Sequence, residues 1–381
     1  MVMKIYSLAF LWYIPIISGL LFQFLYGCNQ APEFSQASQL PDSLQNQKSD
    51  KTGTANIVFK STDGGQTWQD ISEGLPEPVI DVYGDGRNDF FADDNGLWLT
   101  AGNGLYHNKP NSTAPFWTKE IFPDEHSNIA HGKAGVFAYN CWGSGIFQKT
   151  NGTGVWSPVF TNFQEKRVLS VFETARGTIF VGSDRGLFKS TNSGKSWKHA
   201  GVMVGKLVES NAVLLATNQR GILQSTDDGE NWALVISEGG VGIDVANIQG
   251  GFAAINYSTA AKTRRIRTSY DGGKTWQPID AGFPGQAIID STWRPINVGN
   301  PAQGNADSSW HPKEAPLPTE EYKTSIIQVG ENFFCGHTDG IYRSSDKGKT
   351  WKLVLPSEKG KMFKLSVSGN VIYGIQVESH C

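Results

Sequence analysis

Three features of the sequence predict an all-β chain made of repeated four-stranded antiparallel sheets. An eight-residue pattern, S-x-[D/N]-x-G-x-[T/S/N]-W, occurs five times between residues 61 and 351. β-rich segments precede most copies, and seven Trp-ending units follow one another mostly at intervals of 35 to 49 residues. Repeats of about 40 residues are typical of four-stranded propeller blades. We therefore expect a seven-bladed β-propeller that is closed by pairing of its N- and C-terminal strands.

The eight-residue pattern is expected to form the turn between the third and fourth strands of a blade. Ser and Asp side chains can hydrogen-bond nearby backbone N–H groups, and Gly allows a positive φ. The Trp buries a large ring where the next strand begins, so it should fasten the turn to the sheet. We assign a structural role to the Ser, Asp or Asn, Gly and Trp of every copy. These are Ser61, Asp63, Gly65 and Trp68; Ser190, Asn192, Gly194 and Trp197; Ser225, Asp227, Gly229 and Trp232; Ser269, Asp271, Gly273 and Trp276; and Ser344, Asp346, Gly348 and Trp351.

The segments that precede the pattern repeat as well. Residues 179–189, 215–224 and 333–343 each contain a β-rich run, a small-residue turn, a Gly and an alternating strand. Two degenerate copies of this arrangement end at Trp117 and Trp156, and they complete the seven Trp-ending units.

The interval between Trp276 and Trp351 is 75 residues, which is almost twice the usual length. It contains either an insertion or an eighth unit. Residues 285–322 hold no further copy of the pattern and no clean pair of alternating strands, so we favour an insertion.

The two ends of the repeat region predict how the ring closes. Residues 57–60 run directly into the first copy of the pattern without a preceding β-rich segment. Residues 371–376 look like such a segment with no copy of the pattern after it. Pairing the two would complete one blade from both ends of the chain and remove two open sheet edges.

The first 28 residues are expected to be a targeting segment. Residues 5–24 are almost wholly apolar, and Leu25-Tyr-Gly-Cys28 resembles a bacterial lipobox. We expect cleavage and lipidation at Cys28; the alternative is an uncleaved transmembrane anchor, because the apolar run is long. Residues 29–55 are rich in Gln, Ser, Asn, Asp and Pro and should form a flexible tether. The propeller, residues 56–381, would then lie in the bacterial cell envelope, outside the cytoplasmic membrane.

Composition limits the expected partners and cofactors. The chain of 381 residues is 39% hydrophobic, has a net charge of −3 and has no Lys/Arg cluster, which argues against nucleic-acid binding. Once Cys28 is lipidated, Cys141, Cys335 and Cys381 remain, so at most one disulfide can form. Cys335 and Cys381 are one candidate pair, because their units adjoin after ring closure. No spacing indicates a metal site, and we expect a monomer without a cofactor.

Residues 55–381 resemble the β-propellers with bacterial-neuraminidase (Asp-box) repeats, because of the five copies of the pattern. This broad family includes sialidases, xyloglucan-hydrolysing glycosidases, sortilin-type receptors and the photosystem II stability and assembly factor. The resemblance implies the fold but leaves both catalysis and binding open, because one fold hosts both. A sialidase would carry a Phe/Tyr-Arg-Ile-Pro motif before the first copy, and none precedes Ser61. No Arg, Tyr or Glu of the sialidases can therefore be transferred to this chain.

A glycosidase with two catalytic carboxylates is the alternative function. Such an enzyme needs one proton-donating acid and one base that face each other across a cleft. An Asp beside Gly or Asn more often stabilises a turn. The candidate carboxylates are Asp85, Asp89, Asp93, Asp94, Asp184 and Asp339.

The expected blade topology also predicts a binding surface. If the eight-residue turns lie on one rim of the ring, the turns between second and third strands lie on the other. The connections between blades, and with them the 285–322 insertion, share this second rim. Long loops are often functional, and Trp and Arg anchor many interfaces. The candidate binding residues are Trp142, Asp184, Arg185, Arg220, Trp293, Arg294, Trp310, His337 and Asp339.

A complete scaffold without a recognisable catalytic set favours a non-catalytic binding or assembly module of the bacterial cell envelope. A protein or glycan partner is expected on the insertion-bearing rim, and the lipid on Cys28 would anchor the module to a membrane. The alternative is a sialidase-like or two-carboxylate glycoside hydrolase that acts on extracellular glycans.

Overall fold

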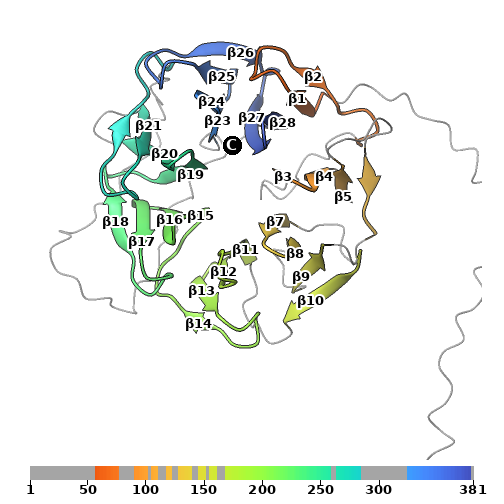
Figure 1. Cartoon of the computed structure of the whole chain (residues 1–381), viewed down its shortest axis with the longest axis vertical. Helices are drawn as coiled ribbons and strands as arrows, with labels where there is room; N and C mark the ends of the chain where they lie inside the picture. The colour runs from red at the N-terminus through yellow and green to blue at the C-terminus, as the bar shows by residue number, and fades with distance from the viewer. Residues whose placement is uncertain are drawn as a thin grey trace, which may run out of the picture. The chain divides into compact units, whose positions relative to one another are not determined.

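The computed structural model describes most of the repeat region. The described residues are 56–76, 90–101, 104–109, 117–121, 128–139, 145–151, 154–160, 168–258, 263–284 and 324–378. They contain 28 strands and no helix. The strands form seven four-stranded antiparallel sheets arranged as blades around a central axis (Figure 1). The predicted seven-bladed β-propeller is therefore confirmed.

Each blade has an inner strand, two middle strands and an outer strand. In that order, the first six blades are β3 (Phe90–Asp93), β4 (Gly96–Ala101), β5 (Gly104–Asn108) and β6 (Thr118–Lys119); β7 (Asn128–Gly132), β8 (Gly135–Tyr139), β9 (Ile146–Thr150) and β10 (Trp156–Phe160); β11 (Val168–Glu173), β12 (Ile179–Ser183), β13 (Gly186–Ser190) and β14 (Lys198–His199); β15 (Leu207–Ser210), β16 (Val213–Asn218), β17 (Gly221–Ser225) and β18 (Ala233–Ile236); β19 (Gly242–Ile248), β20 (Gly251–Ser258), β21 (Thr263–Ser269) and β22 (Gln277–Pro278); and β23 (Ser325–Val329), β24 (Asn332–His337), β25 (Gly340–Ser344) and β26 (Lys352–Pro356).

The seventh blade joins the two ends of the repeat region, as predicted. It consists of β27 (Lys361–Ser368), β28 (Val371–Glu378), β1 (Val58–Ser61) and β2 (Gln69–Asp70). β1 pairs antiparallel with β28, so that Val58 lies opposite Ile375. Just beyond this pair, the backbone N–H of Gln376 donates a 2.7 Å hydrogen bond to the carbonyl oxygen of Ile57. The ring therefore closes by backbone pairing between segments about 300 residues apart.

The core consists of seven hydrophobic clusters, each between two successive blades. In one of them, Phe180 and Leu187 of one blade pack against Leu214 and Ala216 of the next. Each cluster also contains one of the seven Trp residues that end the repeat units, always from the second blade of the pair. The Trp therefore fastens its turn to the preceding blade, a contact that the sequence pattern did not predict.

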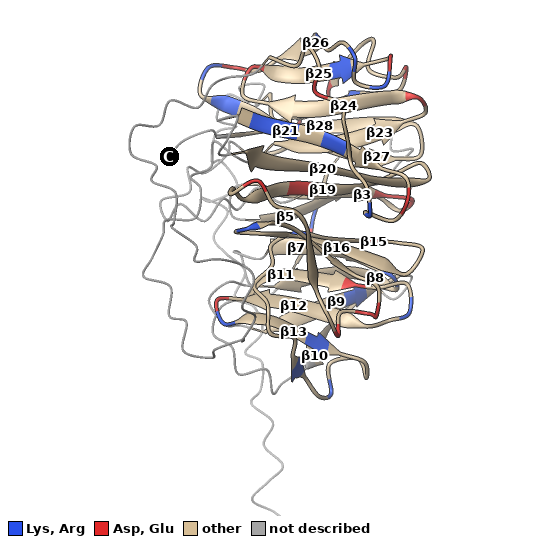
Figure 2. Ribbon diagram, turned by 90° about the vertical axis from the view of Figure 1, so that its left-hand side faces the viewer, with Lys and Arg blue, Asp and Glu red and all other residues tan. Residues whose placement is uncertain are grey.

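The strands of each blade run between two rims, which Figure 2 shows edge-on. We call one the pattern rim: it carries the five eight-residue turns and the turns between first and second strands. The other is the insertion rim, with the turns between second and third strands and the connections between blades. β22 ends and β23 begins at the insertion rim; the segment between them, residues 285–323, lies outside the described residues. β19 contacts β23, so no eighth sheet separates these two blades.

Candidate functional site

The eight-residue turns are held by a hydrogen-bond network that recurs in all five copies. The Ser hydroxyl accepts a bond from the backbone N–H of the Gly at 2.8–2.9 Å and donates one to the Asp or Asn side chain. The same side-chain oxygen accepts the backbone N–H of the seventh residue at 2.9–3.0 Å. These side chains therefore close the turns through hydrogen bonds within each copy.

The same network keeps the carboxylates of these turns ionised. The hydroxyl and then the backbone N–H of Thr350 donate to Asp346, and these bonds lower the pKa of Asp346 to about 2. The backbone N–H and the side chain of Asn231 lower the pKa of Asp227 to about 2 in the same way. A general acid needs a proton to give near neutral pH. These Asp residues are therefore unsuited to the role of catalytic acid.

The Gly of the pattern brings at least four of the five turns close to the preceding blade. Gly229 has a φ of +81°, and a Cβ at this position would lie 2.6 Å from ring atoms of Phe180. Phe180 is fully buried on β12, in the preceding blade. The Gly is therefore required by the backbone conformation and also by the packing between blades.

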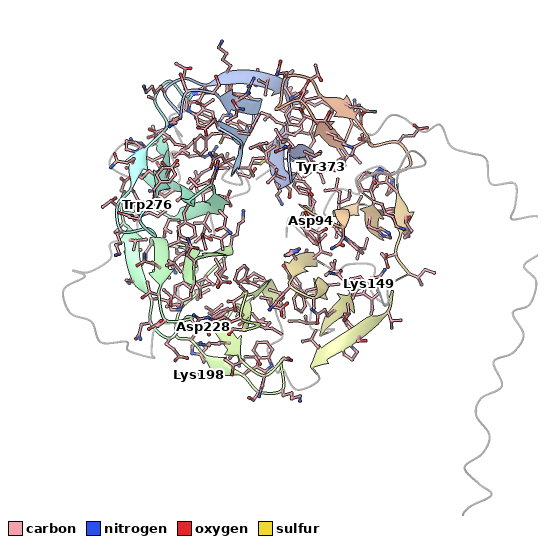
Figure 3. All side chains as sticks on the ribbon, viewed as in Figure 1. Asp94, Lys149, Lys198, Asp228, Trp276 and Tyr373 are labelled. Carbon is pink, nitrogen blue, oxygen red and sulfur yellow. The ribbon has the colours of Figure 1, made fainter. Side chains whose placement is uncertain are left out.

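The candidate carboxylates of a hydrolase are divided between the two rims. Asp93 and Asp94 lie at the β3–β4 turn on the pattern rim, where Asp93 accepts the N–H groups of Asn95 and Gly96. Figure 3 shows Asp94 at the inner side of its blade. Asp184 and Asp339 lie in turns between second and third strands, on the insertion rim.

The length of the strands separates these two groups of carboxylates. A strand of five residues is about 16 Å long, whereas the carboxyl groups of glycosidases are about 5–9.5 Å apart. On the insertion rim itself, two complete blades lie between the turn with Asp184 and the turn with Asp339. Asp85 and Asp89 lie outside the described residues. Among the described candidates, no pair faces across a cleft as hydrolysis requires.

Four of the candidate binding residues are exposed on the insertion rim. They are Asp184, Arg185, Arg220 and Asp339. Polar residues at the ends of the second strands fix these turns: Ser183 accepts the N–H of Arg185, and Asn218 accepts the N–H of Arg220. The turns therefore present charged side chains on a fixed backbone. Trp142, Trp293, Arg294 and Trp310 lie outside the described residues.

The structure corrects the expectation for His337. Its side chain is buried, with 2% exposure, and packs against the rings of Phe283 and Tyr342. Burial, and then the nearby positive charge of Arg264, lower the pKa of His337. His337 ends β24 with its side chain in the core between two blades, so it belongs to the packing of the rim and not to its accessible surface.

An ionic network on β21 was missed by the sequence analysis. Arg265 donates to Asp280 at 2.6 Å, and Arg267, which is 8% exposed, donates to Asn256 and Glu238. Figure 2 shows the positive charge along β21. The two acidic partners lie in the connections on either side of this blade, so only the fold brings them to β21. Both arginines are held by carboxylates, and this network stabilises the rim where residues 285–323 begin.

Several other features bear on chemistry. Within the described segments, no group of His, Cys, Asp and Glu is arranged to hold a metal ion. The same segments contain no helix with the length and apolarity needed to cross a membrane. Among the described residues, Cys335 is a free and buried thiol; Cys141 and Cys381 lie outside them. Burial raises the pKa of the Cys335 thiol, which makes it unreactive.

Comparison with known proteins supports the fold. No protein-family model matches the sequence, and no curated protein matches it. Among solved structures, the chain is similar to a GH74 xyloglucanase from Xanthomonas campestris, with 14% identity and a TM-score of 0.54 over 82% of this chain and 53% of that one. YCF48 from Cyanidioschyzon merolae has 14% identity and a TM-score of 0.49 over 78% of this chain and 97% of its own. Virginiamycin B lyase from Staphylococcus aureus has 11% identity and a TM-score of 0.49 over 78% of this chain and 96% of its own. The chain spans about half the length of the xyloglucanase, and at such identities the likeness shows the β-propeller fold alone.

Proposed function

We propose that this propeller is a non-catalytic binding or assembly module of the bacterial cell envelope, tethered to a membrane through Cys28. Its insertion rim would meet a protein or glycan partner. The observation that carries the proposal is the point where the chain enters the ring. β1 is a third strand that runs toward the pattern rim, so it begins at the insertion rim. There, the Asn56 side chain donates a 3.1 Å hydrogen bond to Glu358, which lies in the connection before β27.

A tether that leaves the ring at Asn56 would hold the insertion rim near the anchor. A flexible chain of the length between Cys28 and Asn56 has a mean end-to-end distance of about 30 Å. The exit also lies beside a candidate binding turn, because the N–H of Ser357 donates to the carbonyl oxygen of Asp339. A partner at the membrane surface would therefore meet this rim before the pattern rim.

The alternative, a glycoside hydrolase, has less support. Asp93 and Asp94 are on one rim, whereas Asp184 and Asp339 are on the other. The carboxylates of the eight-residue turns are engaged in hydrogen bonds that lower their pKa. A module that recognises a partner needs neither a facing pair of carboxylates nor a proton donor, and exposed charges on fixed turns are sufficient.

Site-specific photocrosslinking in cells that produce the full chain tests this proposal. A photoreactive amino acid would replace Arg220 on the insertion rim and, as a matched control, the exposed Asp94 on the pattern rim. We expect one discrete adduct from position 220 and none from position 94. The adduct should be lost with Cys28→Ala, because the soluble variant no longer reaches a partner at the membrane.

Two results would contradict the proposal. Adducts from position 94 alone would place the partner on the wrong rim. Release of reducing sugar from a panel of glycan polymers by the purified protein would show a hydrolase, provided that Asp184→Asn or Asp339→Asn abolishes the activity and so excludes a contaminant.

A further inference from the structure

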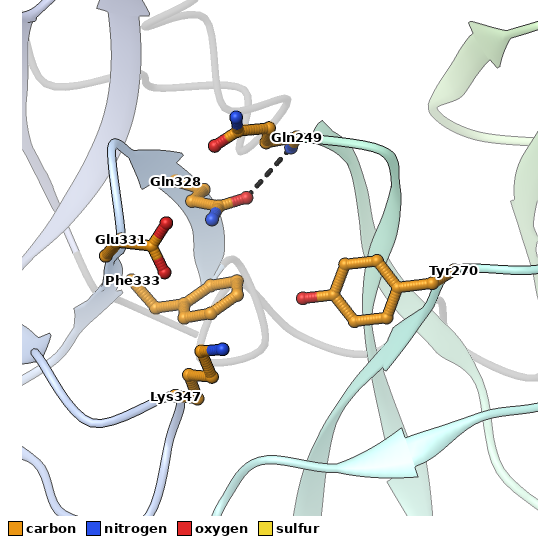
Figure 4. Close-up of a pocket in the computed structure, with 6 residues that line it drawn as sticks. All are labelled: Gln249, Tyr270, Gln328, Glu331, Phe333 and Lys347. Carbon is orange, nitrogen blue, oxygen red and sulfur yellow. Dashed lines mark hydrogen bonds between the residues drawn. The ribbon is translucent and has the colours of Figure 1, made fainter.

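A small pocket opens on the pattern rim, opposite the rim of the proposed function. It lies between the blade that starts with β19 and the blade that starts with β23 (Figure 4). Its volume is about 190 Å³, and it is lined by Gln249, Tyr270, Gln328, Glu331, Phe333 and Lys347. In Figure 4 the phenol of Tyr270 points across the opening toward the side where Phe333 and Lys347 lie.

Internal comparison of the five turns shows that two of the lining residues differ from their equivalents in the other turns. Tyr270 occupies the second position of its turn, where the other four copies carry Thr or Ser. The side chain of Tyr270 is 58% exposed. Lys347 occupies the fourth position of the next turn, and no other copy has a Lys there. The two residues that distinguish neighbouring turns therefore line the same pocket.

Lys347 also holds an unfavourable backbone conformation. The fourth position has a positive φ in every copy, and two copies use Gly there. Lys347 has a φ of +59°. A non-Gly residue in this region costs about 1 kcal/mol. Ser193 and Asp228 share this conformation in two other copies, so what distinguishes Lys347 is its long cationic side chain.

The floor of the pocket is fixed, whereas its walls have free hydrogen-bonding groups. The Gln328 side chain accepts the backbone N–H of Gln249 at 2.8 Å and donates to the carbonyl oxygen of Gly330 at 2.9 Å. Phe333, with 1% exposure, closes the base. Among the described residues, no hydrogen bond or ion pair engages the phenol of Tyr270, the Glu331 carboxylate or the Lys347 ammonium group. The floor is therefore preorganised, and three side chains remain available to a ligand.

The chemistry of the lining selects a class of ligand. One carboxylate and one ammonium group give the pocket no net charge, which favours a neutral ligand. The Gln249 amide and the Tyr270 hydroxyl can each donate and accept hydrogen bonds. The Glu331 carboxylate accepts them and the Lys347 ammonium group donates them. This mixture suits a ligand with hydroxyl groups, because a hydroxyl group both donates and accepts hydrogen bonds. The Tyr270 ring offers an apolar face. The volume holds about six water molecules at ~30 Å³ each, and pockets for drug-sized ligands begin at about 300 Å³.

We propose that this pocket binds a single neutral sugar ring at the end of a glycan. Tyr270 packs against one face of the ring, and Gln249, Glu331 and Lys347 hydrogen-bond its hydroxyl groups. This site goes beyond the proposed function, because it lies on the other rim and requires no tether. A ring engaged by so few groups binds weakly, with a dissociation constant of about 1–10 mM.

Ligand-observed NMR on the full chain, in a detergent without a sugar headgroup, tests the site. The probes are lactose, maltose, cellobiose and N,N′-diacetylchitobiose. We expect saturable binding of at least one of them. Tyr270→Thr, which installs the residue of three other copies, should weaken binding at least about tenfold. The matched control is Ser193→Gly, at the position equivalent to Lys347 in another turn, and it should bind within about twofold of the unchanged chain.

Three results would overturn the site: no binding of any probe, equal binding by the Tyr270→Thr variant, or an equal loss in the Ser193→Gly variant. A thermal unfolding curve of Tyr270→Thr that matches the unchanged chain shows that a lost signal comes from the pocket and not from unfolding. If that variant unfolds early, Glu331→Gln and Lys347→Gly take its place, and unchanged binding by both would refute the proposal. Photocrosslinking from position 220 should be unaffected by all these changes, so this site and the proposed function can fail separately.

Discussion

The indole N–H of Trp351 donates a 2.9 Å hydrogen bond to the carbonyl oxygen of Ile279, which lies 72 residues earlier in the preceding blade. The same relationship joins Trp117 to Ile71 at 2.8 Å. Ile71 and Ile279 both follow the outer strand of their blades, so the two bonds are equivalent by position. These two Trp residues therefore connect successive blades by a hydrogen bond in addition to ending their repeats.

The first prediction separates the hydrogen bond of the Trp from its packing. Trp351→Phe leaves the buried carbonyl of Ile279 without its donor, which should lower the free energy of unfolding by about 1–3 kcal/mol. Trp232 is the control, because no group of the described residues hydrogen-bonds its buried indole nitrogen. The free energy of unfolding should fall less in Trp232→Phe than in Trp351→Phe, by about 1 kcal/mol or more, which is the contribution of one hydrogen bond. Urea unfolding of both variants measures this, and equal losses would show that the bond contributes nothing.

The second prediction concerns glycines with left-handed backbone. Gly272 and Gly229 both have positive φ, but a Cβ at Gly272 has only Val213 nearby, at 3.7 Å, whereas one at Gly229 would clash with Phe180. Gly272→Ala should therefore cost only the backbone penalty of about 1–2 kcal/mol. Gly229→Ala should cost a further 1–3 kcal/mol or so, because the turn must move away from the preceding blade. Similar melting temperatures for the two variants would contradict the proposed packing role of Gly229.

The repeat pattern was sufficient to predict the fold because its information is local. Ser269, Asp271 and Gly273 close a turn through bonds within five residues, so the pattern identifies the turn wherever it occurs. The absence of a β-rich segment before Ser61 likewise predicted the closure with β28. The partner of Trp351 could not be predicted, because Ile279 reaches it only through the packing of two blades.

The candidate sites were harder to predict for the same reason. The expected topology places Asp184 and Asp339 in turns between second and third strands, where the structure has them, since alternation of antiparallel strands follows from the repeat. Which way a strand-end side chain points is decided by packing, and His337 was therefore wrongly expected on the surface. The pocket between Tyr270 and Lys347 was missed because each residue is unremarkable within its own turn. The five aligned turns do contain a signal, namely the single aromatic residue at the second position.

The third prediction is a pH dependence that arises from Glu120. Burial would raise the pKa of this carboxyl, but hydrogen bonds from His107, Lys149 and Trp156 and the charge of Lys149 lower it from 4.5 to about 2. Lys149 lies 2.6 Å from both carboxylate oxygens. A carboxyl with a lower pKa in the folded chain stabilises the fold above the unfolded pKa, and the contribution disappears as pH falls through the folded pKa.

We therefore expect the interaction of Glu120 to be complete above about pH 5 and lost toward pH 2. At pH 6, Glu120→Gln should reduce the free energy of unfolding by about 1–2 kcal/mol, after allowance for screening by solvent. At pH 2.5 the difference from the unchanged chain should be much smaller. Denaturant unfolding at both values measures it. The aspartates of the eight-residue turns titrate in both proteins, so their contributions to the free energy of unfolding cancel in the comparison. A difference between the two proteins that is the same at both pH values would refute the assignment to Glu120.

The last prediction concerns ring closure. Truncation after Ser368 removes β28, which lies between β27 and β1 and pairs with both. It also removes Ile372, Tyr373 and Ile375 from the clusters on either side of the seventh blade. Burial of each such side chain contributes about 1.5–3 kcal/mol, and a whole domain is stable by only about 5–15 kcal/mol. The truncated chain should therefore unfold at a much lower temperature or aggregate through the exposed edges of β1 and β27. Truncation after Glu378 is the control, because it keeps every strand that the structure describes and should preserve the melting temperature. A monomer of unchanged stability that lacks β28 would mean that the terminal strands do not hold the ring together.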